Sequence, residues 1–212
     1  MSNRAVPRRP AMLSFEDAEK IEGDDDPAAA AQVAMTSARA LLGLCDEEFG
    51  PGAVDNLVNA IHAEGVDIVA DLWERSPAFT LPGAFWRLYL FNEWFNRDPQ
   101  VVHQRFREGL AAPFTAGIDD GEDGAQAPDL DDVARRVHAL LNGDEFADLT
   151  TLLRDTALTM KILASGATFG STWIRSNRDR LATMVTRRAG ALMETAAELD
   201  LAADRSAAGR LI

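Results

Sequence analysis

The stretch from Pro82 to Arg97 reads PGAFWRLYLFNEWFNR and decides the fold class of this chain. Aromatic and aliphatic residues cover nearly every face of the helix that this stretch would form. A helix that is apolar on all sides is buried by other elements. Pro82 lies at the expected helix start, where the missing backbone N–H leaves no hydrogen bond unmade. The stretch therefore predicts a central helix surrounded by others.

Outward from this helix, the sequence repeats one signal for a helix start, an aspartate just before the first turn. The signal occurs at Asp26-Pro27, Asp98-Pro99, Pro128-Asp129 and Asp144-Glu145. Alanine, leucine, arginine and glutamate dominate and alternating β-branched runs are absent, so we expect an all-α multi-helix bundle of about seven to eight helices and no β-sheet. The predicted helices are Pro27–Gly43, Ala53–Glu64, Val66–Glu74, Pro82–Arg97, Pro99–Ala111, Leu130–Leu141, Glu145–Ala164 and Ser171–Asp204.

The domain organisation follows from where apolar residues are scarce. Residues 1–26 combine a basic start with an acidic run, which predicts a flexible tail. The stretch Pro113–Pro128 is acidic and rich in glycine, and we expect a mobile loop without catalytic residues. Each half of the chain would be small for a core of its own. We therefore predict one helical domain over residues 27–205 and a short tail over residues 206–212.

Charge and cysteine content restrict the partners and the compartment. The 212 residues carry a formal net charge of -13, which disfavours nucleic acids and anionic membranes. The most apolar stretch, Pro77–Phe91, is interrupted by Arg87 and is too short to cross a bilayer. Cys45 is the single cysteine, so no disulfide forms within the chain. These features predict a cytoplasmic, acidic protein without a secretory signal.

An aromatic cluster is the most individual feature of the sequence. Its candidate ligand-binding or partner-binding residues are Trp73, Trp86, Arg87, Tyr89 and Trp94. Three interpretations stay open: a central core helix, an apolar surface for a protein partner, or a ligand pocket lined by indole rings. Arg87 lies inside the cluster, and an arginine buried there needs a carboxylate or an aromatic ring as its partner.

Residues for catalysis or metal binding are not arranged in any familiar spacing. His62, His103 and His138 lie on three separate predicted helices and lack the short spacings of metal ligands. Three acidic residues follow Cys45, and their charge opposes thiolate formation. Glycine-rich phosphate loops and nucleophile motifs are absent from the sequence. We therefore expect no metal and no cofactor, and we lean towards a protein that is not an enzyme.

An apolar stripe near the C-terminus predicts self-association. The stripe consists of Ile174, Leu181, Val185, Leu192 and Leu199. If Ser171–Asp204 is one helix, it is about 51 Å long, whereas a compact domain of this size is about 43 Å across. The overhanging stripe would then face a second copy, in a homodimer. The alternative is a helix hairpin within one chain, with Gly190 as the point of interruption.

These sequence patterns favour three hypotheses for the function of the protein. The leading hypothesis is a helical protein that acts through protein–protein contacts as a homodimer, because catalytic signatures are missing. The alternative is a regulatory domain that binds a small apolar molecule in an aromatic-lined pocket. An enzyme of unrecognised type is the third hypothesis.

Overall fold

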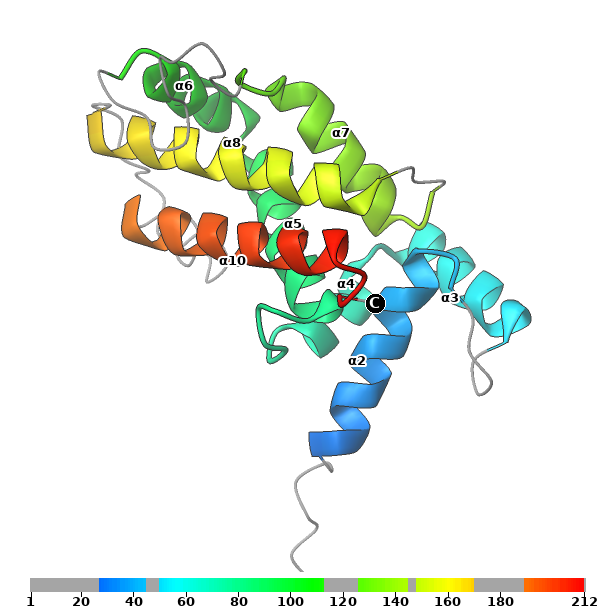
Figure 1. Cartoon of the computed structure of the whole chain (residues 1–212). Coiled ribbons are helices and arrows are strands. Elements are labelled where there is room, and N and C mark those ends of the chain that lie inside the picture. The colour runs from blue at the N-terminus through cyan, green and yellow to red at the C-terminus, as the bar shows by residue number, and fades with distance from the viewer. Residues whose placement is uncertain (1–26, 45–49, 113–125, 145–147, 170–188, 212) are drawn as a thin grey trace, which may run out of the picture.

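The computed structural model describes residues 27–44, 50–112, 126–144, 148–169 and 189–211. In these ranges the chain forms eight helices and no strand, and 80% of it is helical (Figure 1). The predicted all-α bundle is confirmed. The helices are α2 (Pro27–Leu41), α3 (Pro51–Glu64), α4 (Asp67–Trp73), α5 (Leu81–Arg97), α6 (Pro99–Leu110), α7 (Leu130–Leu141), α8 (Leu149–Phe169) and α10 (Ala189–Ala207).

Helix α5 is the centre of the bundle. Twelve of its 17 residues are buried, as expected for a helix that is apolar on all sides. Helices α2, α4, α6, α7 and α10 all contact it. Figure 1 shows α5 passing behind α8 and α10. The aromatic stretch therefore forms the middle layer of the fold.

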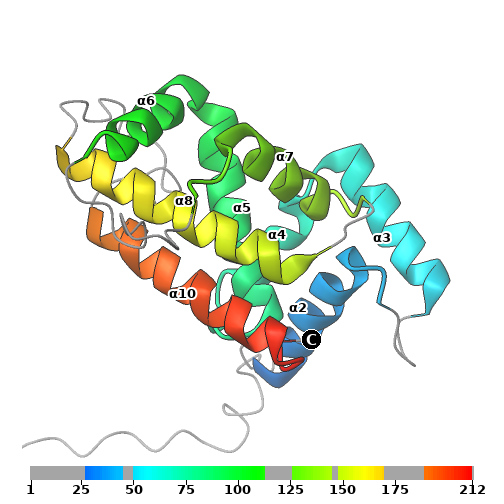
Figure 2. The same ribbon diagram turned by 45° about the horizontal axis from the view of Figure 1, so that its top comes forward.

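Helices α8 and α10 form an antiparallel pair that covers one side of α5. Figures 1 and 2 show the two helices side by side along most of their length. Leu192, Ala196 and Leu199 of α10 are fully buried. At the rim of the pair, the Lys161 ammonium lies 2.7 Å from the Asp200 carboxylate. Gly190 lies within α10 and does not interrupt it, and residues 171–188 of the predicted C-terminal helix lie outside the described residues.

Helix α8 starts later than the sequence predicts, and α6 lacks the predicted capping hydrogen bond. Helix α8 begins at Leu149 rather than at Glu145. The residue before it, Asp148, accepts a hydrogen bond from the Thr151 N–H at 3.2 Å. Asp144 belongs instead to the end of α7, where its N–H donates to the Ala139 carbonyl at 3.0 Å. Asp98 precedes α6 as predicted, but its side chain makes no capping hydrogen bond.

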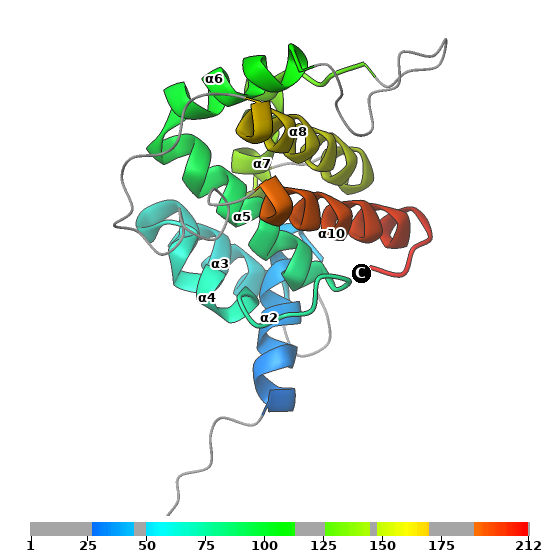
Figure 3. The same cartoon turned by 90° about the vertical axis from the view of Figure 1, so that its left-hand side faces the viewer.

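The first two turns of α2 project from the bundle. Figure 3 shows this end of α2 extending beyond the other helices, and residues 27–33 are all exposed. At the other end of the chain, α10 continues to Ala207, and Leu211 is buried. Both residues lie in the segment 206–212, where the sequence predicts a short tail. The predicted tail over residues 1–26 and most of the predicted loop Pro113–Pro128 lie outside the described residues.

Candidate functional site

The predicted aromatic site lies in the core. Trp73, Trp86, Tyr89 and Trp94 are each at most 6% exposed. Trp73 meets Phe85 edge to face with ring centroids 5.5 Å apart, and Trp86 stacks on Tyr89 at 5.4 Å. These four rings pack against other core side chains and present almost no surface to a partner.

The polar atoms of this cluster join α5 and α4 to neighbouring helices. The Arg87 Nε donates to the Glu198 carboxylate of α10 at 2.6 Å. The Tyr89 hydroxyl donates to the Asp67 carboxylate, and the Trp73 Nε1 donates to the Ser37 hydroxyl of α2 at 3.0 Å. Burial, and then the hydrogen bond to Asp67, raise the pKa of Tyr89 well above its ordinary value. Each contact joins two helices, α5 to α10, α5 to α4, and α4 to α2.

An apolar hollow lies between α2, α3 and α4, and we call it the α2–α4 groove. Its volume is about 390 Å³, and its lining residues are Gln32, Val33, Thr36, Ser37, Leu57, Val69 and Leu72. Val33 on α2 is 51% exposed and Leu72 on α4 is 41% exposed. Ile68, one turn before Leu72, is 42% exposed. Large apolar side chains thus stand on both walls of the groove.

The floor of the groove is part of the core. Val69 is 5% exposed, and the lining residue Ser37 accepts the hydrogen bond from the fully buried Trp73. The Ser37 hydroxyl in turn donates to the Ala34 carbonyl at 3.0 Å. Because these groups are held by the core, the groove is formed before any partner arrives.

A second hollow, which we call the α2–α7 pocket, lies where α2 and α7 end. It measures about 400 Å³ and is lined by Ala40, Gly43, Val54, Asp55, Val58, Asn59 and Gly143. Gly43 and Gly143 have φ values of 69° and 73°, which glycine adopts without strain. The N–H of each glycine donates to the backbone carbonyl three residues earlier in the chain. The N–H of the residue after each glycine donates to the backbone carbonyl five residues before that residue. The two helices therefore end in the same way beside one pocket.

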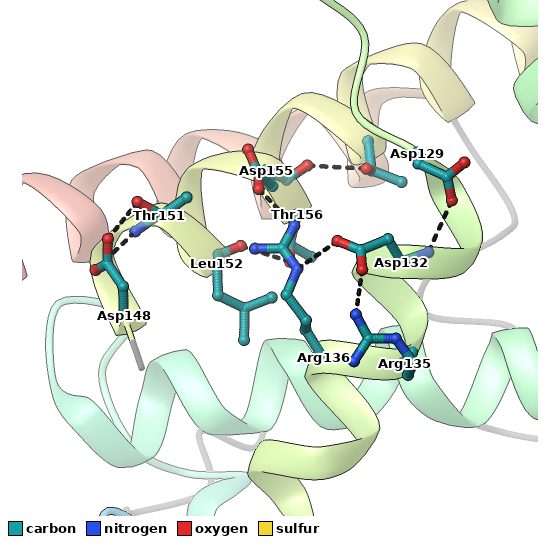
Figure 4. Close-up of polar contacts among 10 residues, drawn as sticks. Asp129, Asp132, Arg135, Arg136, Asp148, Thr151, Leu152, Asp155 and Thr156 are labelled. Atoms are coloured by element: carbon teal, nitrogen blue, oxygen red, sulfur yellow. Dashed lines mark hydrogen bonds and ion pairs between the residues drawn. The ribbon is translucent and has the colours of Figure 1, made fainter. Parts of the chain in front are cut away.

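An ion pair joins the middle of α7 to α8 (Figure 4). The Arg136 guanidinium lies 2.8 Å from the Asp132 carboxylate and 2.5 Å from the Asp155 carboxylate of α8. Asp129 caps α7 by accepting from the Asp132 N–H at 2.8 Å. The hydrogen bond from Arg135 is the main cause that lowers the pKa of Asp132.

The three histidines lie apart, each beside a different neighbour. His62 lies 3.7 Å from Asp144, and His103 lies 2.8 Å from Asp131. The Nε2 of His138 lies 2.9 Å from the Asn142 amide. In the described part of the chain, no three His, Cys, Asp or Glu residues come together as metal ligands.

The predicted dimer stripe is divided by the structure. Leu192 and Leu199 are fully buried within the chain, on the side of α10 that faces the core. Ile174, Leu181 and Val185 lie outside the described residues. The outer side of α10 carries Met193 and Leu201, which are 36% and 47% exposed.

The chain was compared with protein-family models, with curated proteins and with solved structures, and none of them matches it. Among the described helices, none has an apolar run long enough to cross a membrane. Function is therefore inferred from the geometry of the two hollows.

No separate signal for the α2–α4 groove is present in the sequence. Val33 and Leu72 fit the apolar spacing of ordinary amphipathic helices, so both would be expected in the core. Their exposure depends on how α3 and α4 turn against α2.

Proposed function

We propose that this protein acts through protein–protein contacts, by holding a helical segment of a partner protein in the α2–α4 groove. The observation that supports the proposal is the exposure of Val33 and Leu72, which line one preformed apolar hollow. Exposed apolar patches of this kind mark interaction sites on folded proteins. An amphipathic helix binds such grooves through apolar side chains spaced three and four residues apart.

The shape of the groove favours a helix over a small molecule. Small-molecule sites enclose their ligand and bury roughly 70–90% of its surface. Here the walls are half open, since Val33 is 51% exposed and the preceding residues of α2 are exposed as well. The first turns of α2 project beyond the other helices (Figure 3), and Gln32 and Val33 at the end of these turns line the groove, which suits a long ligand that lies along α2.

The homodimer predicted from the C-terminal stripe is a separate proposal with less support. The described members of the stripe, Leu192 and Leu199, are buried within the chain. The homodimer is therefore supported only by Ile174, Leu181 and Val185, which lie outside the described residues. The net charge of -13 also opposes the approach of two copies. We therefore treat a second copy as a competing occupant of the groove.

The proposal is tested with a synthetic helical peptide about four turns long, with leucines on one face and glutamines elsewhere. Leu72→Asp and Val33→Asp should each weaken its binding about tenfold or more, because a carboxylate replaces an apolar contact. Leu201→Asp is the matched control, since Leu201 is 47% exposed, between Leu72 and Val33, but lies on α10. Fluorescence anisotropy of the labelled peptide measures the dissociation constants.

Two results would contradict the proposal. In the first, Leu72→Asp and Leu201→Asp bind the peptide equally well. In the second, the wild-type protein sediments as a dimer that Leu72→Asp dissociates, which would assign the groove to a second copy of the chain.

A further inference from the structure

The α2–α4 groove and the α2–α7 pocket lie along one face of α2. Val33, Ser37, Ala40 and Gly43 follow each other at spacings of three and four residues and line the two hollows in turn. Ten residues of helix rise about 15 Å, so the hollows are neighbours. Helix α3 contributes Leu57 to the groove and the next residue, Val58, to the pocket.

The two hollows differ in charge, because only the pocket contains an ionisable side chain. Asp55 and Asn59 lie one turn apart on α3, and both are exposed. The C-terminal ends of α2 and α7 add partial negative charge from their last carbonyl groups. Asp144 follows Gly143, with His62 3.7 Å from its carboxylate. A cation is the group that this pocket would attract.

Helices α3 and α4, beside the two hollows, are acidic. Residues 50–75, which include α3 and α4, contain five carboxylates and one arginine, Arg75. The carboxylates are those of Asp55, Glu64, Asp67, Asp71 and Glu74. A basic partner would be drawn to this face, and an acidic partner would be repelled.

We propose that the partner helix carries a lysine or arginine beyond its apolar face, and that this cation enters the α2–α7 pocket. The inference rests on the proposed function, since the groove would hold the apolar face of the same helix. The Asp55 carboxylate and the Asn59 amide oxygen are acceptors for an ammonium or guanidinium group. An apolar anchor and a cation seven to ten residues apart on a helix are separated by about 10–15 Å, which matches the spacing along α2.

The test uses three peptides that share the leucine face of the glutamine peptide. One keeps its glutamines, one has two lysines near one end, and one has two glutamates there. We expect the lysine peptide to bind about fivefold to tenfold more tightly than the glutamine peptide, and the glutamate peptide to bind less tightly than both. Asp55→Asn should remove most of this lysine advantage, the ratio by which the lysine peptide binds more tightly than the glutamine peptide. Glu194→Gln on α10 removes the same charge elsewhere and should leave that advantage intact.

The variants separate this inference from the proposed function. Leu72→Asp adds a negative charge, so a loss of lysine-peptide binding in this variant comes from the apolar contact. If the lysine peptide gains nothing over the glutamine peptide, or gains as much in Asp55→Asn, the cation pocket is refuted and the groove stands. If Asp55→Asn abolishes lysine-peptide binding while Leu72→Asp leaves it intact, the groove is refuted and the pocket stands. If no peptide binds, both are refuted.

Discussion

At the scale of single residues, Tyr89 shows how the core connects helices at a polar point. It is the only tyrosine in the chain, and it is 6% exposed between α5 and α4. Its hydroxyl donates to the Asp67 carboxylate at the start of α4. Burial first, and then this hydrogen bond, raise the pKa of Tyr89 above the ordinary value of 10.0.

This raised pKa predicts alkaline sensitivity. The folded state holds the phenol proton more tightly than the unfolded state, so the contribution to stability is complete below about pH 10 and is lost as the pH rises further. Tyrosinate absorbance should therefore appear only together with unfolding, as followed by circular dichroism. Tyr89→Phe should be less stable at neutral pH and should depend less on pH above about 10. Ionisation near pH 10 in a protein that stays folded would contradict this account.

At the scale of elements, two glycines allow α6 and α8 to pack closely. A Cβ atom at Gly109 would lie 1.9 Å from the Ile162 carbonyl oxygen, and one at Gly166 would lie 2.0 Å from the Arg105 carbonyl oxygen. These atoms belong to the backbone, so the helices themselves would have to separate. Neither glycine could be assigned this role from its position in the sequence.

We expect Gly109→Ala to lower the free energy of unfolding by about 1–3 kcal/mol, because the added methyl group forces α6 away from α8. Gly52→Ala in α3 is the matched control, since a Cβ atom there would meet nothing within 4 Å. That variant should gain about 0.4–1 kcal/mol from the restricted unfolded chain. Urea denaturation compares the two variants. Equal stabilities would show that the α6–α8 crossing is not tight.

The bounds of a helix could be predicted from the sequence where its cap and its apolar stripe lie within or next to the helix itself. Leu130–Leu141 was predicted with both bounds correct, because its cap at Asp129 and its apolar stripe lie within the helix. The start of α8 was wrong, because Asp144 is used by the end of α7. The candidate site could not be predicted, because Asp55 and Gly143 are far apart in sequence and only the packing of α3 and α7 brings them to one pocket.

At the scale of the whole molecule, the C-terminal segment closes the core. The described helix α10 has 19 residues and is about 28 Å long, which fits within the bundle. Its inner face places Leu192 and Leu199 in the core. The Arg87–Glu198 pair at 2.6 Å connects it to α5 as well. The stripe that predicted a second copy is, in its described part, covered by the chain itself.

Replacing Leu192 distinguishes a core position from an interface between copies. Leu192→Glu buries a carboxylate without a partner and should lower the free energy of unfolding by at least about 3 kcal/mol. Met193→Glu is the matched control, because Met193 is 36% exposed on the outer side of α10, and its effect should stay within about 0.5 kcal/mol. Thermal unfolding followed by circular dichroism measures both effects, and sedimentation records the size of each variant. A Leu192→Glu protein that keeps its stability but sediments as a smaller species than the wild type would place Leu192 between two copies, and α10 would then belong to an assembly rather than to a closed core.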